Sequence, residues 1–469
     1  GVGNGGFSLR KKSKMIECIE KINWKTDIIL SDRLKLYVID KTNSVIPEDV
    51  YFSKCLLEKG IGKLAPRSVA LEFSQETQNS INPLGGHNFY LCNNFKNIGI
   101  IKKTNKIAFF SPYEYSIGGG EYYAAMIMKY FLDLNYHVYF FTRTDIKTVS
   151  VTFTHFTNKS YFEKLIIVNP IYIDTYENKY FDYFIQMANN KYPPYFNINI
   201  AHKNIYHCQF PYDYDKLNNI ENENKLNNFD AIILNSEYTK KYYLKCFNTN
   251  IQNKIRILYP LCNNNNNNNN IASEPLNKIN NTFIMIGRIF PTKNKENNKN
   301  FDLVINTFNN IKSNNYKLYI VGSCKNNEYL KYLKNLCNDN IQIYNDVSDE
   351  EKNALMLKSK YFIHAAGINY NSGEVPSAEE HFGISIIESL LNNCIPICAN
   401  RGFPPYYIEN NKNGFLFDNL EELKLIIDDL INNNIKINEE YCIKYNKKIC
   451  EKFNIENYIS NISNIMLNI

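Results

Sequence analysis

The chain has 469 residues, of which 44% are hydrophobic, so it is long enough for two or three packed domains and too apolar for wholesale disorder. Its 53 Lys and Arg against 47 Asp and Glu leave a net charge of +6, too dilute at this length to mark a nucleic-acid or anionic-membrane binder. The twelve cysteines form no C-x2-C pair and no apolar run reaches the ~18–20 residues of a bilayer-spanning helix, so we expect reduced thiols in a cytoplasmic protein without a transmembrane segment.

The first block, residues 1 to 95, starts with Gly rather than Met, and we expect a longer chain to precede it. GNGGFSLR is followed by a helical pattern and later by PEDVYFSKCLLEKGI, whose acidic pair opens an apolar helix. Such a pair can serve simply as a helix cap. As an alternative, these stretches together resemble the acceptor-side half of inverting GT-A glycosyltransferases, among which the β1,3-galactosyltransferases have a similar E-D-V-Y helix start.

That resemblance implies a partial GT-A-like α/β segment. Asp49, with Glu48 as the second choice, would be the general base that deprotonates an acceptor hydroxyl. His87 would lie where such folds place a metal-binding histidine. The nucleotide-binding half, with its Asp-x-Asp motif and a divalent Mn or Mg ion, would precede Gly1, so we expect the segment to be inactive as it stands.

The second block, residues 105 to 262, alternates strand and helix patterns. KIAFF (106–110) predicts a buried strand, followed by a Gly-rich turn, the helix EYYAAMIMKYFLDLN and the strand HVYFFT. Further strands are predicted in KLIIV, DYFIQ, NIYHCQF and FDAIILN. Repeated β-α-β units of this kind indicate a parallel sheet.

A polar linker, 263–280, follows, with an unbroken run of Asn from 263 to 270. From 281 to 440 the pattern resumes, with strands predicted in FIMIGR, YKLYIVG, IQIYN, YFIHAA and CIPICAN. Ser348 and Glu351 form a capping box before a helix. The predicted fold class is α/β, with two Rossmann-like doubly wound domains that face a cleft and bind a ligand at the carboxyl ends of their strands.

Two groups of residues follow predicted strands in these domains. Gly118–Gly120 open a helix, where backbone N–H groups can approach an anionic or sugar ligand, although G-x-G-x-x-G is absent. Arg288 ends a strand and Lys299 precedes a helix, so the two cations suit a diphosphate unless both are solvated surface residues.

The strongest pattern is EEHFGISIIESLLNNCIPICANRGFPPYYI, residues 379–407. A Gly-containing loop would carry Glu380, and a helix from about Ser385 would carry Glu388 in its first turn. The backbone N–H groups of residues 382–384 would then face a phosphate, with a carboxylate on each side for sugar and ribose hydroxyls. The alternative is a pair of solvated glutamates.

E-H-F-G-I-x-x-x-E, with G-R and K upstream, resembles the retaining GT-B glycosyltransferases of group 1, the Glu-x7-Glu family. This family includes phosphatidylinositol and dolichol-linked mannosyltransferases, bacterial polysaccharide enzymes and sucrose synthases. The resemblance covers about residues 105–469 and implies a C-terminal helix, 445–469, that rejoins the first domain. It also implies a metal-independent, retaining hexosyltransferase with a UDP- or GDP-linked donor and a glycan, lipid or protein acceptor.

Residue by residue, the resemblance assigns the donor diphosphate to Arg288 and Lys299, the ribose to Glu388 and the border of sugar and acceptor to Gly119 and Gly120. The catalytic Glu380 and the backbone of Phe382, Gly383 and Ile384 would hold the transferred sugar and its diphosphate. Which of lysines 293, 295 and 299 reaches phosphate stays open. His207 lies where the family often has a histidine near the reacting sugar, and a core histidine is the alternative.

Two other functions remain alternatives. One is a nucleotide-sugar-binding module that lacks turnover and serves a multidomain glycan-assembly protein. The other is an NAD-dependent dehydrogenase, which the absence of G-x-G-x-x-G from both domains disfavours.

Overall fold

The computed structural model describes residues 105–188, 198–211, 225–247, 249–262, 278–291 and 299–469, together with two short strands nearer the N-terminus. The chain divides into two units, Gly1–Thr104 and Asn105–Ile469. In the first unit, β1 (Ser74–Gln75) and β2 (Gly85–Gly86) pair in parallel.

The second unit opens with a seven-stranded sheet of parallel strands, in the order β5-β4-β3-β6-β7-β8-β9. The chain therefore starts in the middle, runs to one edge and returns beside β3. The strands are β3 (Lys106–Phe110), β4 (His137–Phe141), β5 (Leu165–Val168), β6 (Phe181–Ala188), β7 (Ala201–Cys208), β8 (Ala231–Leu234) and β9 (Ile255–Ile257). The α-helices among them are α6 (Gly119–Asp133), α7 (Ile146–Phe156), α8 (Lys159–Phe162), α10 (Glu237–Cys246) and α11 (Thr249–Gln252).

The core of this first domain forms where α6 covers the sheet. Tyr123, Ile127 and Phe131 follow one another at intervals of four residues, so they share a face of the helix, and each is at most 1% exposed. They pack in one cluster with Ile107 of β3 and Ile205 of β7, both fully buried. The four-residue spacing of these apolar side chains thus determines which face of α6 packs against the sheet.

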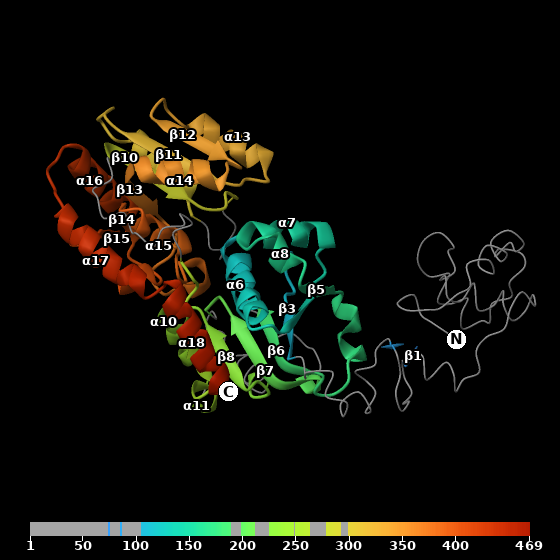
Figure 1. Ribbon diagram of the computed structural model, residues 1–469. Helices are drawn as coiled ribbons and strands as arrows, with labels where there is room; N and C mark the ends of the chain where they lie inside the picture. The colour runs from blue at the N-terminus through green and yellow to red at the C-terminus, as the bar shows by residue number, and fades with distance from the viewer. Residues whose placement is uncertain are drawn as a thin grey trace, which may run out of the picture. The chain divides into compact units, whose positions relative to one another are not determined.

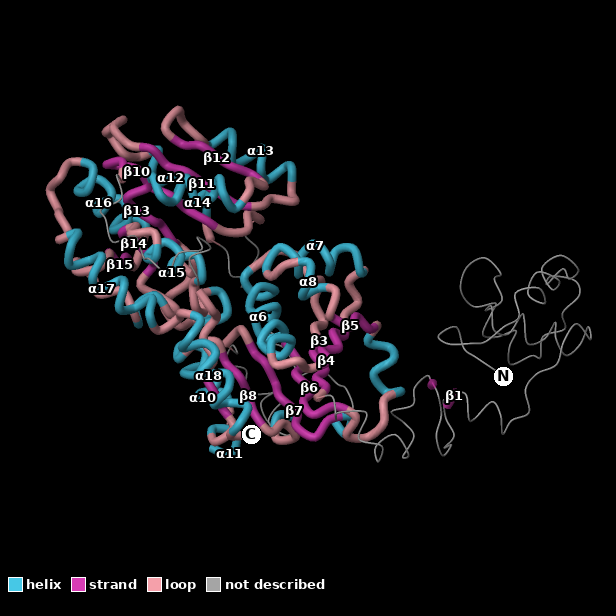
Figure 2. Tube along the Cα trace, in the orientation of Figure 1, coloured by secondary structure: helices cyan, strands magenta, loops and turns pink. Residues whose placement is uncertain are grey.

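A second sheet follows, with six parallel strands in the order β12-β11-β10-β13-β14-β15 (Figure 2). Its strands are β10 (Ile279–Ile286), β11 (Lys317–Gly322), β12 (Ile341–Asn345), β13 (Ser359–His364), β14 (Ile395–Ala399) and β15 (Phe415–Phe417). Its helices are α12 (Phe301–Asn309), α13 (Asn327–Leu336), α14 (Asp349–Lys358), α15 (Ile384–Leu391), α16 (Leu420–Ile431) and α17 (Glu439–Glu451). As the capping box predicts, the Ser348 hydroxyl accepts a hydrogen bond from the Glu351 N–H at the start of α14.

The last helix, α18 (Ile455–Leu467), returns to the first domain, where Figure 1 shows it beside α10 and β8. Its Tyr458 and Ile462 belong to the same apolar cluster as α6. Its Ser463 hydroxyl lies 2.9 Å from the Tyr130 hydroxyl of that helix. The Phe453 carbonyl, just before α18, accepts a hydrogen bond from the Cys262 N–H. The chain therefore leaves the first domain and re-enters it at neighbouring points.

Asparagine, abundant in this sequence, has two structural uses in the described residues. Its side chain caps helix N-termini, because the amide oxygen accepts a hydrogen bond from an N–H of the first turn. The Asn caps with such a bond are Asn158, Asn169, Asn326, Asn419, Asn438 and Asn454. Asn also takes the left-handed backbone conformation, which it tolerates better than most residues. Those positions are Asn135, Asn281, Asn300, Asn393, Asn411 and Asn433.

These two doubly wound domains confirm the predicted α/β fold class. The cysteines of the described residues are free thiols, and all except Cys337 are buried. Among the described helices, none combines the length and the apolar character that crossing a bilayer requires.

Candidate active site

The second sheet brings the predicted basic and acidic residues to one edge. β10 and β13 are neighbours although β11 and β12 lie between them in sequence, so the chain order reverses there. Ligands of doubly wound sheets bind at such a point, outside the carboxyl ends of the strands. Beyond β10 the chain continues through Gly287 into the exposed Arg288, and beyond β13 it leads from His364 to Glu380.

Glu380 is the centre of a three-residue cluster at this point. Its side chain is 12% exposed and forms an ion pair, through Oε2, with the Nζ of Lys299. The Nε2 of His364, at the end of β13, lies 2.8 Å from the same Oε2. The other carboxylate oxygen, Oε1, accepts a long hydrogen bond of 3.5 Å from the Phe382 N–H. Oε2 therefore has two close nitrogen neighbours, on Lys299 and His364, whereas Oε1 has one long hydrogen bond.

The protonation states of the cluster follow from burial and charge. Burial alone would raise the pKa of Glu380, but the charge of Lys299 and the contact with His364 outweigh it and hold the pKa well below its usual range. Burial lowers the pKa of His364, and the Lys299 charge lowers it further, against the opposing effect of Glu380. These shifts favour an ionised Glu380 and a neutral His364 at neutral pH.

Lys299 is the one of the three candidate lysines that the described residues include; lysines 293 and 295 lie outside them. Its side chain runs over Gly287, where a Cβ would come within 3.0 Å of the Lys299 Cγ. Glycine at the end of β10 therefore leaves room for the ammonium group to reach Glu380.

The N-terminus of α15 opens directly after Glu380. Its cap, Gly383, has φ 90°, a left-handed conformation that favours glycine, and no side chain caps the helix in the described structure. The first intrahelical bonds run from the N–H groups of Ile386 and Ile387 to the Gly383 carbonyl, so the preceding N–H groups have no partner within the helix. Together with the helix dipole, they form an anion site beside Glu380.

Aromatic packing fixes the backbone that enters this helix. The Phe382 ring is 3% exposed and stacks on Phe403, with centroids 5.6 Å apart. It also meets Phe453 edge to face at 5.1 Å. The Tyr407 hydroxyl donates a hydrogen bond of 3.2 Å to the Phe382 carbonyl. The Phe382 side chain therefore packs in the core, and its carbonyl is fixed by Tyr407.

From the sequence we expected Glu388 in the first turn of its helix. It lies at the start of the second turn, because α15 begins at Ile384, one residue before the expected start. Burial raises the pKa of its carboxyl, and the charge of Lys352 on α14 opposes this effect. Lys352 in turn pairs with Asp349 at 2.9 Å. Burial raises the pKa of Tyr122 on α6, and the charge of Glu388 adds a smaller effect in the same direction.

The Gly-rich turn meets Arg288 from the first domain. A Cβ on Gly118 would lie 2.6 Å from the Glu121 Oε2 and 3.2 Å from the Arg288 Cζ, so both side chains lie close to this turn. Burial raises the pKa of Glu121, and the Arg288 charge opposes it. A Cβ on Gly119 would lie 3.4 Å from the Cδ1 of Ile384 in α15. The predicted glycines and the predicted phosphate loop are thus in contact.

His207 lies away from this meeting point, in the core beneath α6. It is fully buried, its ring meets Tyr123 edge to face at 4.6 Å, and neither ring nitrogen has a hydrogen-bond partner. Burial lowers its pKa to about 3. This is the environment of a core histidine, the alternative that the sequence left open. Two residues further on, the Gln209 Nε2 donates a hydrogen bond of 3.1 Å to the Gly120 carbonyl, so Gln209 is the residue of this segment that touches the turn.

The loop before Glu380 is tied to α10 of the first domain. The carboxylate of Glu379 is 1% exposed and accepts a hydrogen bond of 2.6 Å from the Tyr238 hydroxyl. The Ser236 hydroxyl donates one of 2.5 Å to the His381 carbonyl. Adjacent glutamates therefore differ: Glu379 is a structural anchor, whereas Glu380 faces the switch point.

Sequence reasoning missed three residues of this region: Glu121, Gln209 and His364. Glu121 follows the predicted Gly-rich turn, and Gln209 and His364 lie at the carboxyl ends of predicted strands. These positions were the signal that could have identified them. The predicted general bases Asp49 and Glu48 and the predicted metal ligand His87 lie outside the described residues.

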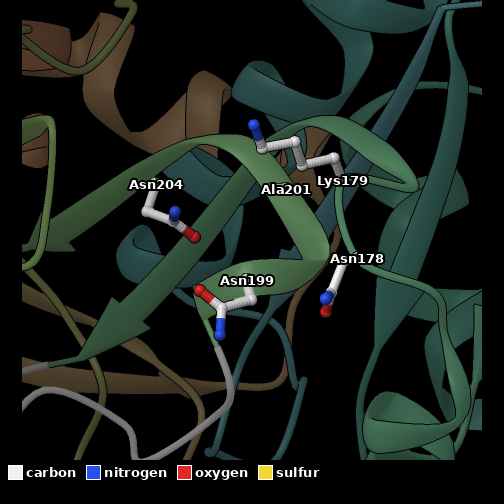
Figure 3. Close-up of a pocket in the computed structure, with 5 residues that line it drawn as sticks. All are labelled: Asn178, Lys179, Asn199, Ala201 and Asn204. Carbon is white, nitrogen blue, oxygen red and sulfur yellow. The ribbon is translucent and has the colours of Figure 1, made fainter.

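A separate depression of about 180 Å³ lies at the start of β7, lined by Asn178, Lys179, Asn199, Ala201 and Asn204 (Figure 3). Ala201 is the first residue of that strand, so the depression opens at the amino end of the sheet. Ligands of such sheets bind at the opposite end. We therefore place the candidate site at the β10–β13 switch point instead.

Comparisons with known proteins concern both units of the chain. Residues 266–449 match the model of the family described as glycosyl transferases group 1. Residues 1–87 match a family described as a protein of unknown function, DUF5672. None of the curated proteins matches the chain.

Several solved structures share the fold of the second unit. HepE of Anabaena in complex with UDP and glucose has a TM-score of 0.55 at 15% identity, covering 78% of this chain and 100% of its own. A glycosyltransferase from Rickettsia africae reaches 0.57 at 14% identity, with 78% and 98% covered. Sucrose-phosphate synthase from Thermosynechococcus elongatus reaches 0.50 at 13% identity, with 77% and 98% covered. Residues 266–449 are therefore similar to the glycosyl transferases group 1 family, and the second unit has a GT-B fold.

Proposed function

We propose that the second unit transfers a hexose from a nucleotide-diphosphate sugar to an acceptor hydroxyl, with retention of anomeric configuration and without a metal ion. The observation that carries this proposal is the cluster of Glu380, Lys299 and His364 beside the uncapped N-terminus of α15. It places a carboxylate for sugar hydroxyls next to positive charge for a diphosphate. A module that binds the nucleotide sugar without turnover is the alternative that the experiment below separates.

In this proposal the diphosphate lies between Arg288, Lys299 and the backbone N–H groups of residues 382–384. Their charge and the helix dipole stabilise the negative charge that develops as the diphosphate leaves. Glu380 accepts hydrogen bonds from the transferred sugar, and Glu388 accepts them from the ribose. Gly119 and Gly120 border the sugar and the acceptor from the first domain.

Retention follows if the acceptor attacks from the face that the diphosphate leaves. The leaving phosphate oxygen then accepts the acceptor's proton, so the protein needs neither a nucleophile nor a metal at the reacting carbon. The contacts of α10 with the loop before Glu380 keep the two domains together during this step. HepE, of similar fold, has been crystallised with UDP-glucose, and we propose a UDP- or GDP-linked donor here, with a glycan, lipid or protein acceptor.

For the first unit we propose a GT-A-like segment in which Asp49 is the general base and His87 a ligand for Mn or Mg.

A panel of UDP- and GDP-sugars tests the function of the second unit in the full chain. A true donor stabilises the folded state by about 2.7 kcal/mol at 100 times its Kd, and we expect one nucleotide class to raise the Tm by several degrees. NMR of the product should then show the anomer of the donor, formed equally well with and without EDTA. Binding without transfer to any acceptor would support the binding module, and an inverted product would overturn retention.

A glycine behind Glu380 gives a second test. Gly402 has φ 70°, and a Cβ there would lie 2.2 Å from the backbone oxygen of Glu380. Gly402→Ala is therefore expected to cost about 1–3 kcal/mol in unfolding free energy and to lower the transfer rate at least tenfold, because Glu380 must shift. Gly373→Ala is the matched control, with φ 77° but only the movable end of Tyr242 within 3.0 Å of its Cβ. Equal transfer by the two folded variants would contradict the placement of Glu380.

A further inference from the structure

His364 lies at the last position of β13, where the sheet is otherwise apolar. The ring is 2% exposed, its chain neighbours Ile363 and Ala365 are fully buried, and so is Cys398, its partner in β14. Burying an imidazole in such surroundings is unfavourable unless a hydrogen bond offsets the lost hydration. Its Nε2 lies 2.8 Å from the Glu380 Oε2 but outside hydrogen-bond geometry, so this carboxylate is the group placed to offset that loss once the two side chains align.

The geometry also assigns the proton. A neutral imidazole has one N–H and one bare nitrogen, and only the N–H can face a carboxylate oxygen favourably. The proton therefore belongs on Nε2, the nitrogen that faces Glu380. Since Lys299 contacts the same Oε2, both donors act on one oxygen, and Oε1 keeps only its 3.5 Å contact with the Phe382 N–H.

We propose that His364 is a positioning residue, which fixes the Glu380 carboxylate so that Oε1 faces the first turn of α15. This inference rests on the proposed function, in which Glu380 accepts hydrogen bonds from the transferred sugar. Lys299 places positive charge beside both the carboxylate and the diphosphate, whereas His364 only orients the Glu380 carboxylate. Its loss should consequently weaken the contacts of the sugar and leave those of the diphosphate unchanged.

Two variants, His364→Gln and His364→Asn, separate the effect of an N–H donor near Glu380 from the effect of side-chain packing. Glutamine places its side-chain N–H₂ close to where the histidine Nε2 lies, and asparagine is too short to reach Oε2. Binding is measured by calorimetry in the full chain with UDP-glucose and UDP, and in a second arm with GDP-mannose and GDP. We expect His364→Asn to lose about tenfold in affinity for the nucleotide sugar, with less than a twofold change for the nucleoside diphosphate. His364→Gln should retain both affinities within about threefold.

Controls distinguish the outcomes. His202→Asn, at an exposed position of β7, should change neither affinity, and Tm values report whether each variant folds. Equal weakening of nucleotide sugar and diphosphate by His364→Asn, or identical behaviour of the Asn and Gln variants, would overturn the positioning role. Failure of the wild type to bind any nucleotide sugar would instead overturn the proposed function, and ¹⁵N-histidine NMR would then decide the contact itself. It should show a neutral Nε2–H ring for His364 whose signals shift in Glu380→Gln.

Discussion

Glu380→Gln is expected to lower kcat for sugar transfer by about 10²–10³-fold, the range found when one preorganised electrostatic group is removed. The substitution keeps the size of the side chain but removes its negative charge, and it leaves Lys299 without its counter-ion. The amide also offers one acceptor oxygen instead of two, so it cannot bind Lys299 and a sugar hydroxyl as the carboxylate does. Initial rates at saturating donor, combined with calorimetric binding of the nucleoside diphosphate, measure the effect.

Glu379→Gln is the matched control for this prediction, since it changes the neighbouring residue in the same way. The Glu379 carboxylate accepts hydrogen bonds from the Tyr238 hydroxyl and from the N–H groups of Gly373 and Gly402, at 2.6, 2.6 and 2.7 Å. Its replacement should lower the free energy of unfolding by about 2 kcal/mol, because bonds to a charged acceptor are lost. Transfer by the folded protein should fall far less than in Glu380→Gln. Near wild-type turnover by Glu380→Gln would remove Glu380 from the catalytic machinery.

The strands of the two sheets were predictable because they depend on local pattern. A run such as KIAFF is buried on both faces of a parallel sheet and reads as a continuous apolar strand. Gly383 and the residues around it were also predictable, because a glycine before an apolar helix marks an N-terminus whose N–H groups are open. These features need no information about distant residues.

Contacts between distant segments were not predictable in the same way. Nothing near His364 in sequence indicates Glu380, because the chain passes through a long loop before returning to the end of β13. His207 and Gln209 lie only two residues apart, and the sequence could not decide which one reaches the glycine turn. The expected start of α15 was one residue too late, so Glu388 lies just beyond the first turn: Gly383, in its left-handed conformation, is the residue before the helix.

Lys299→Met is expected to affect stability and transfer together. The side chains of Lys299 and Glu380 are 18% and 12% exposed, and removing one partner of a buried pair leaves an uncompensated charge, which costs about 3 kcal/mol in unfolding free energy. Transfer should fall at least 10²-fold, because the same ammonium group offsets the charge of the diphosphate. Chemical unfolding and initial rates measure the two effects.

The pH dependence of this loss has a definite sign. Because Lys299 holds the pKa of Glu380 low, the pairing stabilises the wild type fully above about pH 4.3, the ordinary pKa of Glu, and the stabilisation fades as the pH falls below it. Without Lys299 the pKa of His364 should rise, since the Lys299 charge lowers it and Glu380 raises it. Imidazolium can then replace the ammonium group as the pH falls toward 6. The stability difference between wild type and Lys299→Met should therefore be largest near pH 8 and shrink on acidification.

The double variant Lys299→Met with Glu380→Gln separates these effects. It contains neither charge, so it should recover most of the stability that Lys299→Met loses, because a neutral pair needs no compensation in a buried site. Transfer should stay as low as in the single variants, since both the diphosphate and the sugar have lost their partners. Additive stability losses in the double variant would mean that the two residues do not form a coupled pair. In that case Lys299 would act on the diphosphate alone, and the orientation of Glu380 would depend on His364.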